Sequence, residues 1–567
     1  MSSWESVGTK RHHTGMRLPP LDAPATAAAD RPLRLAPIGC QRRDWLATVL
    51  RGAFGAATAR ALWPMCAALA PAARTAHAAT DLPALGDGGD LTLAEERRLG
   101  DQIARAIYRD PAYLDDPVLD GYLEAVWMPL FAAARQRGEL PDTLAERFAW
   151  RLLLARDRTV NAFALPGGYL GVHLGLIGVT GSADELASVL AHELSHVTQR
   201  HIARLLSRQS QQAPLVLAAM VLGALAASAA RNADIASAAI AGGQAVALQS
   251  QLNFSRDMER EADRIGLSVL TAAGFDGQGF VGMFERLQQA ARLNDDGGYP
   301  YLRSHPLDTE RIADMRARLP WTAPDAAARA AAGPVAATVH ACMAARARVL
   351  ADPAPDRLQA HVRSGRDSRE PGRAYAAALA GIGLRDPASA LQGLATVEAV
   401  ADTAAAQRVA AWLRLELLHQ LADDPRLPAA EARALPDAVQ RAAADGSRTG
   451  LLLAARAAVR LSAPHVQPVW QRVQAWCAQH PDDAGAWSAL AQLQHAGGQP
   501  VRAARSEGEA RLALLDAAGA LDRFRAAQRL AREQGLQDLV ELSVLDARAR
   551  HAERLLREQQ AEHAAGR

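Results

Sequence analysis

Two histidines and a glutamate lie at residues 192–196, in the stretch HELSH, with the spacing that a zinc peptidase requires. Residues four apart share one face of a helix, so His192 and His196 can each direct a ring nitrogen at one metal ion. Zinc accepts imidazole nitrogens and prefers four ligands. Glu193 is offset around the helix, where it can take a proton from a metal-activated water during attack on a carbonyl. The alternative is a surface helix with two solvated histidines.

A third protein ligand must come from elsewhere in the chain. Gln199 and Ile202 occupy the glycine and third-histidine places of the short-spaced HExxHxxGxxH pattern, which excludes that pattern. His201 is out of that register by one position, and we expect it to be a surface residue. A carboxylate from another helix is the remaining route.

The stretch SRDMEREAD, residues 255–263, offers three such carboxylates. Glu259 and Asp263 are four residues apart and share a helix face, whereas Glu261 does not share it. We therefore expect Glu259 to be the third metal ligand and Asp263 to hydrogen-bond a ligand histidine. The alternative is an ordinary charged helix face.

Local signals predict the elements that carry these residues. Ser182 is a good N-cap residue and Glu185 follows three positions later, which is the pattern of a capping box at the start of the HELSH helix. A second helix is expected from near Ser255 to Gly274. The HELSH helix is expected to be amphipathic, with an apolar face formed by Leu186, Leu190, Leu194 and Val197.

The segment before HELSH predicts a small amount of sheet. Residues 91–134 have apolar residues at helical spacing, and the run Phe148–Leu154 resembles a strand. In NAFALPGGYLGVHLGLI, residues 161–177, Pro-Gly-Gly separates two apolar runs. It is expected to form a turn that joins two strands, or a strand and a helix.

The second half of the chain predicts helical repeats. A proline- and alanine-rich linker follows at residues 321–337, and we place a domain boundary at about 320–335. Residues 482–512 have the spacing of a tetratricopeptide unit, a helix pair that buries its face by stacking on its neighbours. Degraded units are expected from Arg373 and Asp522. The alternative is an unspecialised helical bundle. The spacing is carried by Trp487, Leu490, Ala491, Gly498, Ala503 and Ala504.

Bulk properties limit the class of protein. A chain of 567 residues with 49% apolar and 22% charged residues is expected to form two or more globular domains. The net charge of +2 and the absence of a basic stripe argue against nucleic acid as a partner. Two cysteines follow the leader, Cys342 and Cys477. An oxidising compartment would permit them to pair, but the sequence does not place them within bonding distance.

The first 78 residues have the features of an export signal. They hold ten Lys and Arg against four Asp and Glu, a net of +6. Arg42 and Arg43 precede an apolar region and resemble a twin-arginine signal, and Ala76-His77-Ala78 has a cleavage pattern. We expect residues 1–78 to be a disordered leader with an export signal of the twin-arginine or general secretory type. The alternative is a disordered alanine-rich tail.

An uncharged run of eighteen residues occupies positions 213–230. This length is the lower limit for a membrane span, but eight of the eighteen residues are alanine, which is only weakly hydrophobic. A buried or lid-like helix is favoured. A surface-lying membrane contact and a transmembrane helix are the alternatives.

Four motifs together resemble a known family. HELSH, SRDMEREADRIG and SHPLDTERIADMRARL, with NAFALPGGYLGVH upstream and helical repeats downstream, resemble the BepA-type periplasmic metalloprotease/chaperones. These belong to the HtpX/CAAX-prenyl-protease-like zinc endopeptidases. The resemblance covers about residues 90–320 closely, and the repeats only in architecture. HtpX-like members carry obvious transmembrane helices, whereas this chain has only the 213–230 run, which favours a soluble periplasmic form.

The resemblance implies roles for particular residues. His192, His196 and Glu259 would hold one zinc ion per chain, with Glu193 as general base and acid. His305 would be able to reach the metal and hold the site off; the alternative is a solvent-facing loop histidine. A strand near residues 161–173 would line the cleft and pair with an extended substrate. The substrate-strand residues would be Asn161, Ala162, Phe163, Gly167 and Gly168.

The combined expectation is a mainly helical protein with three parts. A leader at 1–78 precedes an α+β zinc metallopeptidase domain with a small sheet at 79–325 and a tetratricopeptide-like solenoid at 326–567. The resemblance implies a periplasmic endopeptidase that degrades or assists misfolded or stalled outer-membrane proteins. The repeats would hold the client or dock on the outer-membrane assembly machinery.

Two rival interpretations remain. In the first, the protein is a non-catalytic chaperone or scaffold with a silent or structural zinc site, and the repeats carry the function. In the second, it is an integral-membrane protease anchored by residues 213–230. A peripheral membrane contact through the same run is compatible with the favoured interpretation.

Overall fold

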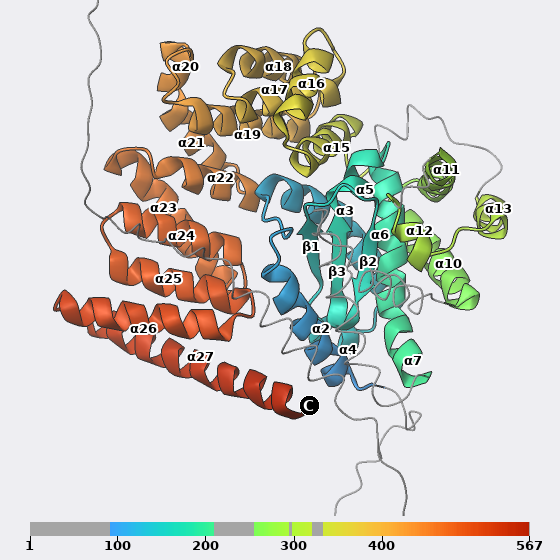
Figure 1. The fold of residues 1–567 in the computed structure, drawn as a ribbon, viewed down its shortest axis with the longest axis horizontal. Coiled ribbons are helices and arrows are strands. Elements are labelled where there is room, and N and C mark those ends of the chain that lie inside the picture. The colour runs from blue at the N-terminus through green and yellow to red at the C-terminus, as the bar shows by residue number, and fades with distance from the viewer. Residues whose placement is uncertain (1–90, 209–254, 294–297, 320–332, 566–567) are drawn as a thin grey trace, which may run out of the picture. The chain divides into compact units, whose positions relative to one another are not determined.

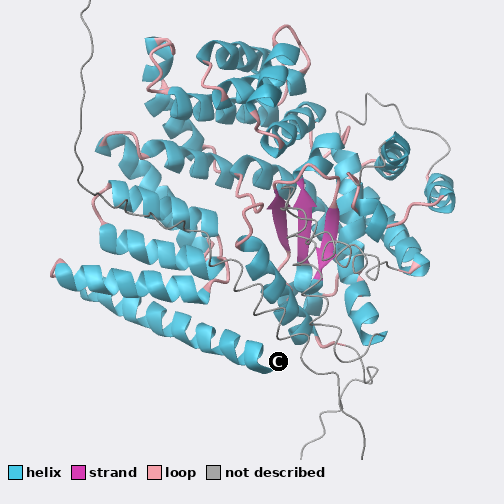
Figure 2. Cartoon of the chain, in the orientation of Figure 1, coloured by secondary structure: helices cyan, strands magenta, loops and turns pink. Residues whose placement is uncertain are grey.

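The computed structural model describes residues 91–208, 255–293, 298–319 and 333–565. The predicted leader and the uncharged run 213–230 lie outside these residues. The described chain is mainly helical with one small sheet, and helices follow it to the C-terminus (Figure 2). The predicted fold class, mainly helical with a small sheet that is followed by a helical region, is confirmed. None of the described helices is both long enough and apolar enough to cross a membrane.

The sheet has three strands in the order β1-β3-β2. β1 (Arg151–Ala155) pairs in parallel with β3 (Tyr169–His173), and β2 (Ala162–Leu165) pairs antiparallel with β3. The predicted Pro-Gly-Gly turn joins β2 to β3. The strand predicted from Phe148 begins only at Arg151, because Trp150 has a φ of 50° and interrupts the extended backbone.

Two glycines make the β2–β3 turn feasible. Gly167 and Gly168 have φ values of 73° and 83°, a region that residues with a side chain rarely adopt. The turn is also tightly packed: a Cβ on Gly168 would lie 2.9 Å from the Cβ of Phe148, and one on Gly167 would lie 2.9 Å from the Cα of Arg97. The turn therefore fixes where β2 lies.

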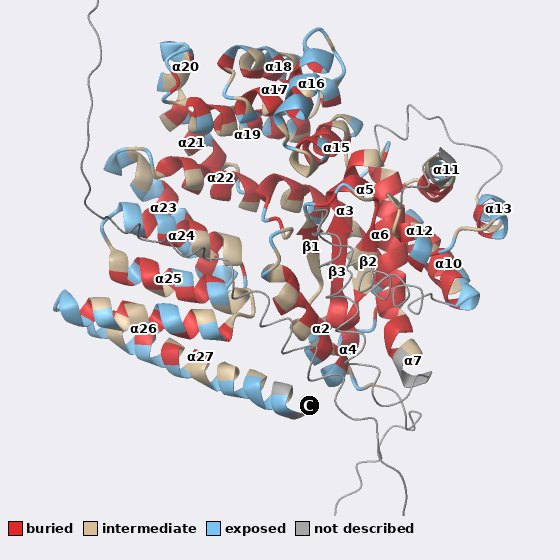
Figure 3. Ribbon diagram, viewed as in Figure 1, coloured by how far each residue is buried: buried red, intermediate tan, exposed pale blue. Residues whose placement is uncertain are grey.

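Helix α6 (Ala183–Thr198) carries HELSH and runs through the middle of this part of the molecule (Figure 1). It packs against β2 and against three helices: α3 (Pro117–Gln136), α10 (Arg256–Ala272) and α11 (Gln278–Leu293). Every residue from Glu185 to Thr198 is buried as a result (Figure 3). The prediction of an amphipathic helix is wrong, because neighbours cover this helix on all sides.

Only half of the predicted capping box forms. The Ser182 side chain accepts a hydrogen bond from the Glu185 backbone N–H, so the helix begins where predicted. The Glu185 carboxylate instead accepts from the Gly181 N–H and pairs with Arg286 of α11. Helix α10 begins after Ser255, close to the predicted start, and the Ser255 side chain caps it by accepting a hydrogen bond from the Met258 N–H.

Seven further elements of the described chain complete the region around α6. Four of them precede α6 in the chain: α2 (Leu93–Tyr108), α4 (Asp142–Arg147), the 3-10 turn η1 (Pro166–Gly168) and α5 (Leu174–Val179). Three follow α6 in the chain: α7 (His201–Arg208), α12 (Tyr301–Ser304) and α13 (Thr309–Arg318).

A series of helices follows residue 333. Successive helices pack against one another, and Figure 1 shows α23 to α27 side by side. The predicted repeat unit at 482–512 is a helix pair, α24 and α25, whose turn contains Gly498 with a φ of 70°. The helices are α15 (Ala337–Ala351), α16 (Pro355–Gly365), α17 (Pro371–Gly383), α18 (Pro387–Ala399), α19 (Ala404–Leu421), α20 (Ala429–Arg433), α21 (Leu435–Ala444), α22 (Arg448–Ala458), α23 (Ala463–Gln479), α24 (Ala484–Ala496), α25 (Pro500–Ala513), α26 (Ala517–Glu533) and α27 (Leu539–Ala565).

The first helix of this series packs on the sheet-containing part. Helix α15 contacts α5 and α3, and one hydrophobic core cluster runs from Leu114 to Leu493. The predicted domain boundary falls largely on residues 320–332, outside the described residues, and stays a prediction. Cys342 and Cys477 are both buried and free.

Candidate metal centre

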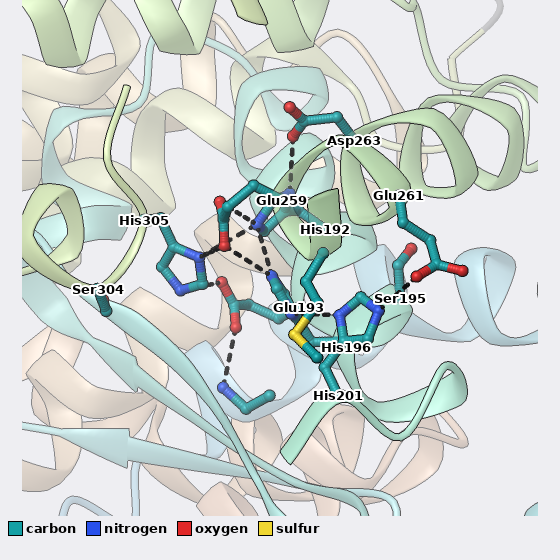
Figure 4. Close-up of polar contacts among 12 residues, drawn as sticks. His192, Glu193, Ser195, His196, His201, Glu259, Glu261, Asp263, Ser304 and His305 are labelled. Atoms are coloured by element: carbon teal, nitrogen blue, oxygen red, sulfur yellow. Dashed lines mark hydrogen bonds and ion pairs between the residues drawn. The ribbon is translucent and has the colours of Figure 1, made fainter. Parts of the chain in front are cut away.

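Four buried donor side chains converge at one point between α6, α10 and the loop after α12 (Figure 4). Their ligand atoms all lie within 4.8 Å of one another. The Nε2 atoms of His192 and His196 are 2.9 Å apart, and His192 Nε2 is 3.3 Å from Nδ1 of His305. Glu259 Oε1 lies 3.0 Å from that Nδ1 and 3.4 Å from His196 Nε2.

This donor set fits a tetrahedral metal ion. With metal–ligand bonds of about 2.0–2.1 Å, the donors of a tetrahedral zinc site lie about 3.3–3.4 Å from one another. The separations above, and the 3.5 Å between His192 Nε2 and Glu259 Oε2, bracket that value. Three imidazoles and one carboxylate are also the nitrogen and oxygen ligands that zinc accepts.

Close packing of α10 on α6 brings Glu259 to the two histidines. Gly266 of α10 lies directly against α6, and a Cβ at this position would be 3.2 Å from the backbone nitrogen of His192. The absence of a side chain there lets the two helices approach. Glu259, in the first turn of α10, then points at the face of α6 that carries His192 and His196 (Figure 4).

Asp263 lies one turn beyond Glu259 and contacts the outer side of His192. Its Oδ1 is 2.9 Å from His192 Nδ1, which leaves Nε2 of that ring facing the other donors. Arg311 of α13 holds the carboxylate with two hydrogen bonds of 2.7 and 2.8 Å. The same guanidinium lies 2.8 Å from Glu259 Oε2.

Arg311 is a further residue of the candidate site, and the sequence did not point to it. It is buried, whereas Arg316 and Arg318 in the same short helix lie mainly at the surface. Nothing in the stretch TERIADMRAR separates the first arginine from the other two. Its position in the quoted motif SHPLDTERIADMRARL was the one available signal.

The prediction that His201 is a surface residue is wrong. Its side chain is buried, with Nδ1 2.8 Å from His196 Nδ1 and Nε2 3.0 Å from Glu261 Oε2. Glu261 does not face the metal position, as its helix register indicated, but it is connected to the site through His201. Helical register alone could not show this, because His201 belongs to the next helix, α7.

Glu193 is completely buried beside the four donors. Its Oε2 accepts a hydrogen bond of 2.9 Å from the Ala164 N–H of β2, and its Oε1 is 3.4 Å from His305 Nε2. Burial raises the pKa of this carboxyl above its usual value. A carboxylate with a raised pKa next to a metal position is suited to accept and return a proton.

The pKa values of the two α6 histidines shift in opposite directions. Burial by itself would lower the pKa of His192, but hydrogen bonds with Asp263 and Glu259 raise it to about 10. Burial holds the pKa of His196 well below its usual value. A metal ion binds unprotonated ring nitrogens, so metal binding at these two histidines would be coupled to the release of protons.

The residues predicted to bind a substrate strand lie along β2 and its turn. Ala162 and Phe163 are in β2, Asn161 immediately precedes it, and the two glycines are in the turn. β2 is an edge strand of the sheet, and the Ala164 N–H points away from β3 toward Glu193. The described edge of the sheet therefore runs past the candidate metal centre.

His305 is buried rather than solvent-facing. It follows α12 and its ring stacks on Tyr301 with centroids 4.7 Å apart. Its Nδ1 occupies one corner of the four-donor arrangement. Of the predicted site residues, the structure thus brings together His192, Glu193, His196, Glu259, Asp263 and His305.

Several known proteases are similar to this chain. Residues 133–319 match the model of peptidase family M48. The chain is 38% identical over 240 residues to a Vibrio cholerae protein whose description carries the name beta-barrel assembly-enhancing protease, covering 42% of this chain and 47% of the relative. It is 34% identical over 245 residues to the beta-barrel assembly-enhancing protease of Escherichia coli, covering 43% and 48%.

A more distant relative is the mitochondrial metalloendopeptidase OMA1 of Saccharomyces cerevisiae, 30% identical over 204 residues, covering 35% of this chain and 55% of the relative. The chain spans about half the length of the two bacterial relatives. The segment that matches the family model, residues 133–319, contains every residue of the four-donor cluster.

Proposed function

We propose that this chain, which carries a peptidase family M48 domain and resembles the beta-barrel assembly-enhancing proteases, is a zinc-dependent endopeptidase. The observation that carries the proposal is the convergence of four buried donors beside a buried glutamate. Donors of this kind facing one another without a cation would leave lone pairs unsatisfied in the protein interior. A bound cation resolves that arrangement.

Each side chain has a distinct part in the proposed reaction. His192, His196 and Glu259 would hold the zinc, whose Lewis acidity activates a water and polarises the peptide carbonyl. Glu193 would accept the proton of the attacking water and deliver it to the leaving amine. Asp263, held by Arg311, would keep His192 oriented.

The edge strand β2 supports an extended substrate pose. We propose that a client segment lies along residues 161–165 and exchanges backbone hydrogen bonds with them, as in β-augmentation. The Ala164 N–H, which Glu193 engages in this structure, faces the same side. A substrate in this pose would have a carbonyl near both Glu193 and the metal position.

His305 would act as an internal blocker. With Nδ1 among the donors and Nε2 3.4 Å from Glu193 Oε1, it occupies the region that the attacking water would need. We propose that this arrangement is a resting state. Displacement of the loop after α12 would then open the fourth coordination position.

The proposed setting is the Gram-negative periplasm, with misfolded or stalled outer-membrane proteins as clients. The name of the bacterial relatives supports a role in β-barrel assembly. The helical series after residue 333 would hold the client or dock on the outer-membrane assembly machinery, since stacked helix pairs form extended binding surfaces. The architecture of these helices supports that role.

The decisive experiment is degradation of an unfolded outer-membrane protein by the purified full chain, with and without a chelator, beside Glu193→Gln. Chelator-sensitive cleavage that the variant lowers by about 10²–10⁴-fold, with zinc content and folding unchanged, would support a peptidase. Equal turnover by Glu193→Gln would contradict the proposal. Zinc binding without cleavage by either form would favour the scaffold interpretation or a blocked site.

His305→Ala separates a blocked site from a silent one. If His305 blocks the site, the variant degrades the same client faster than the wild type and remains chelator-sensitive. The double variant with Glu193→Gln serves as the control and should be inactive. Unchanged or lower activity in a stably folded His305→Ala protein would contradict the blocking role.

A further inference from the structure

His201 lies in the interior between a predicted metal ligand and a charged residue on another helix (Figure 4). Its Nδ1 is 2.8 Å from His196 Nδ1, and its Nε2 is 3.0 Å from Glu261 Oε2. Glu261 Oε2 also accepts a 3.0 Å hydrogen bond from Arg204 of α7. His201, Glu261 and Arg204 have no part in the proposed reaction.

One set of tautomers satisfies all of these contacts. His196 directs Nε2 at the other donors, so its proton is on Nδ1, on the far side of the ring. That N–H can donate only to an unprotonated Nδ1 on His201. His201 then carries its proton on Nε2 and donates to the Glu261 carboxylate. The chain of contacts therefore has one consistent direction, from His196 to Glu261.

A tight turn of the backbone between α6 and α7 positions His201. Helix α6 ends at Thr198, and Arg200 adopts a φ of 52°, an uncommon conformation for a residue with a side chain. Glu96, which is buried, holds the Arg200 guanidinium at 3.0 Å. Because of this turn, α7 begins at His201 and the ring points back at the last turn of α6 (Figure 4).

His192 provides the comparison. Its Nδ1 contacts the Asp263 carboxylate directly at 2.9 Å, and Arg311 holds that carboxylate. His196 has the same order of groups with one imidazole inserted: ligand, His201, carboxylate, arginine. A carboxylate on the outer nitrogen of a ligand histidine fixes its tautomer and makes it a stronger metal ligand.

We infer that His201 is a positioning residue that transmits the negative charge of Glu261 to His196, so that both histidines of HELSH are supported by a carboxylate. This inference rests on the proposed function, because it requires a metal on His196. Its consequence is a metal affinity and a ligand field that depend on His201 and Glu261, neither of which touches the metal position.

We call the series His196, His201 and Glu261 the relay. Three variants test it, and the readout is the Zn²⁺ affinity, measured by competition with a chromogenic chelator. His201→Leu removes both hydrogen bonds and should weaken the affinity about 10–100-fold. His201→Asn should recover part of that loss, because its Oδ1 can accept from His196 in place of Nδ1. Glu261→Gln keeps an acceptor for His201 but removes the charge, so it should weaken the affinity by a smaller factor.

The visible absorption spectrum of the Co²⁺-substituted protein is a second readout that a purely structural role would not change. His201→Leu and Glu261→Gln should both shift the ligand-field bands. Glu310→Gln is the matched control, because Glu310 pairs with Arg260 of α10 at the surface. It should change neither affinity nor spectrum.

The outcomes separate this inference from the proposed function. Wild-type Zn²⁺ affinity and Co²⁺ spectra in His201→Leu and Glu261→Gln, with Asp263→Asn weakened, would overturn the relay and leave the peptidase proposal intact. Failure of the wild type to bind Zn²⁺ would contradict both. If His201→Leu does not fold, Glu261→Gln still decides, because Glu261 is partly exposed and outside the core.

Discussion

Arg346 of α15 and the four donors of the metal centre are both buried clusters of charged and polar groups, but they are organised in opposite ways. All five N–H groups of Arg346 reach an acceptor. Asp116, the N-cap residue of α3, accepts two of these hydrogen bonds, Tyr375 of α17 accepts one and Glu416 of α19 accepts two, at 2.7–3.1 Å. Every donor of the guanidinium is therefore satisfied within the cluster.

The metal centre does the reverse. There the lone pairs of His192, His196 and Glu259 converge on one another at 2.9–3.5 Å. Asp263 and His201 contact only the outer nitrogens of the two histidines, and Arg311 contacts Glu259 from outside the cluster. Mutually satisfied charges indicate a structural role, whereas converging acceptors indicate a place for a cation. The difference explains why one buried cluster supports a functional proposal and the other does not.

Removing Arg346 should have the largest effect on stability. Arg346→Ala leaves the buried Asp116 and the partly buried Glu416 without the arginine that pairs with both, which costs about 3–5 kcal/mol in the free energy of unfolding. The measurement is urea unfolding followed by circular dichroism. Arg460→Ala, which breaks a pair with the exposed Asp423 at the surface, is the control and should change the stability far less.

Equal stability of Arg346→Ala and Arg460→Ala would contradict this view of the Arg346 cluster. In that case the Arg346 cluster would contribute no more than a surface ion pair. Metal affinity should be unchanged in Arg346→Ala under conditions where it is folded, because the cluster lies outside the donor set.

Metal removal should have the next largest effect, and it should act on the other cluster. Free Zn²⁺ at 100 times its Kd stabilises a folded protein by about 2.7 kcal/mol. A chelator should therefore lower the Tm of the wild type. The double variant His192→Ala/His196→Ala should unfold at a chelator-independent temperature; a chelator-sensitive Tm in that variant would place the metal elsewhere.

Acidification should have the smallest effect, and it should act near Arg346. His340 of α15 is neutral in the fold: its Nε2–H donates to Thr180 O at 3.0 Å, and its Nδ1 accepts from Tyr122 Oη at 2.7 Å. Burial lowers its pKa. The unfolded chain takes up a proton below about pH 6.5 and the folded chain does not, so stability falls with decreasing pH.

The expected loss is up to about 1.4 kcal/mol per pH unit between the unfolded and folded pKa values of His340. His340→Gln keeps a donor and an acceptor but does not titrate, so its stability should fall less between pH 7 and pH 5. Urea midpoints at the two pH values measure this. His495→Gln, at an exposed position, should behave like the wild type.

The candidate site was predictable where its residues are spaced by helical periodicity. His192 with His196, and Glu259 with Asp263, are each four residues apart on one helix, so the sequence alone places each pair on one face. The meeting of the two helices was inferred from the chemistry that zinc needs. His201 and Arg311 escaped prediction because they reach the site across a turn and from a third helix.

The same distinction holds for the fold. The Pro-Gly-Gly turn, the N-cap Ser182 and the start of α10 near Ser255 are local features, decided by backbone geometry and by hydrogen bonds within a few residues, and each was found from sequence. The prediction of an amphipathic α6 failed, and so did half of its capping box. In both cases a partner from a distant element, α10 or Arg286 of α11, replaced the environment that the local pattern implied.

The sequence by itself determined which side chains could do chemistry and which helices would carry them, because residue type and periodicity are properties of the local chain. Only the tertiary structure decided which donors meet, which nitrogen of each histidine is left for a metal, and that His305 occupies the fourth corner. These depend on contacts across 46 to 113 residues of chain, such as His305 with Glu259 and with His192, for which no local pattern carries information.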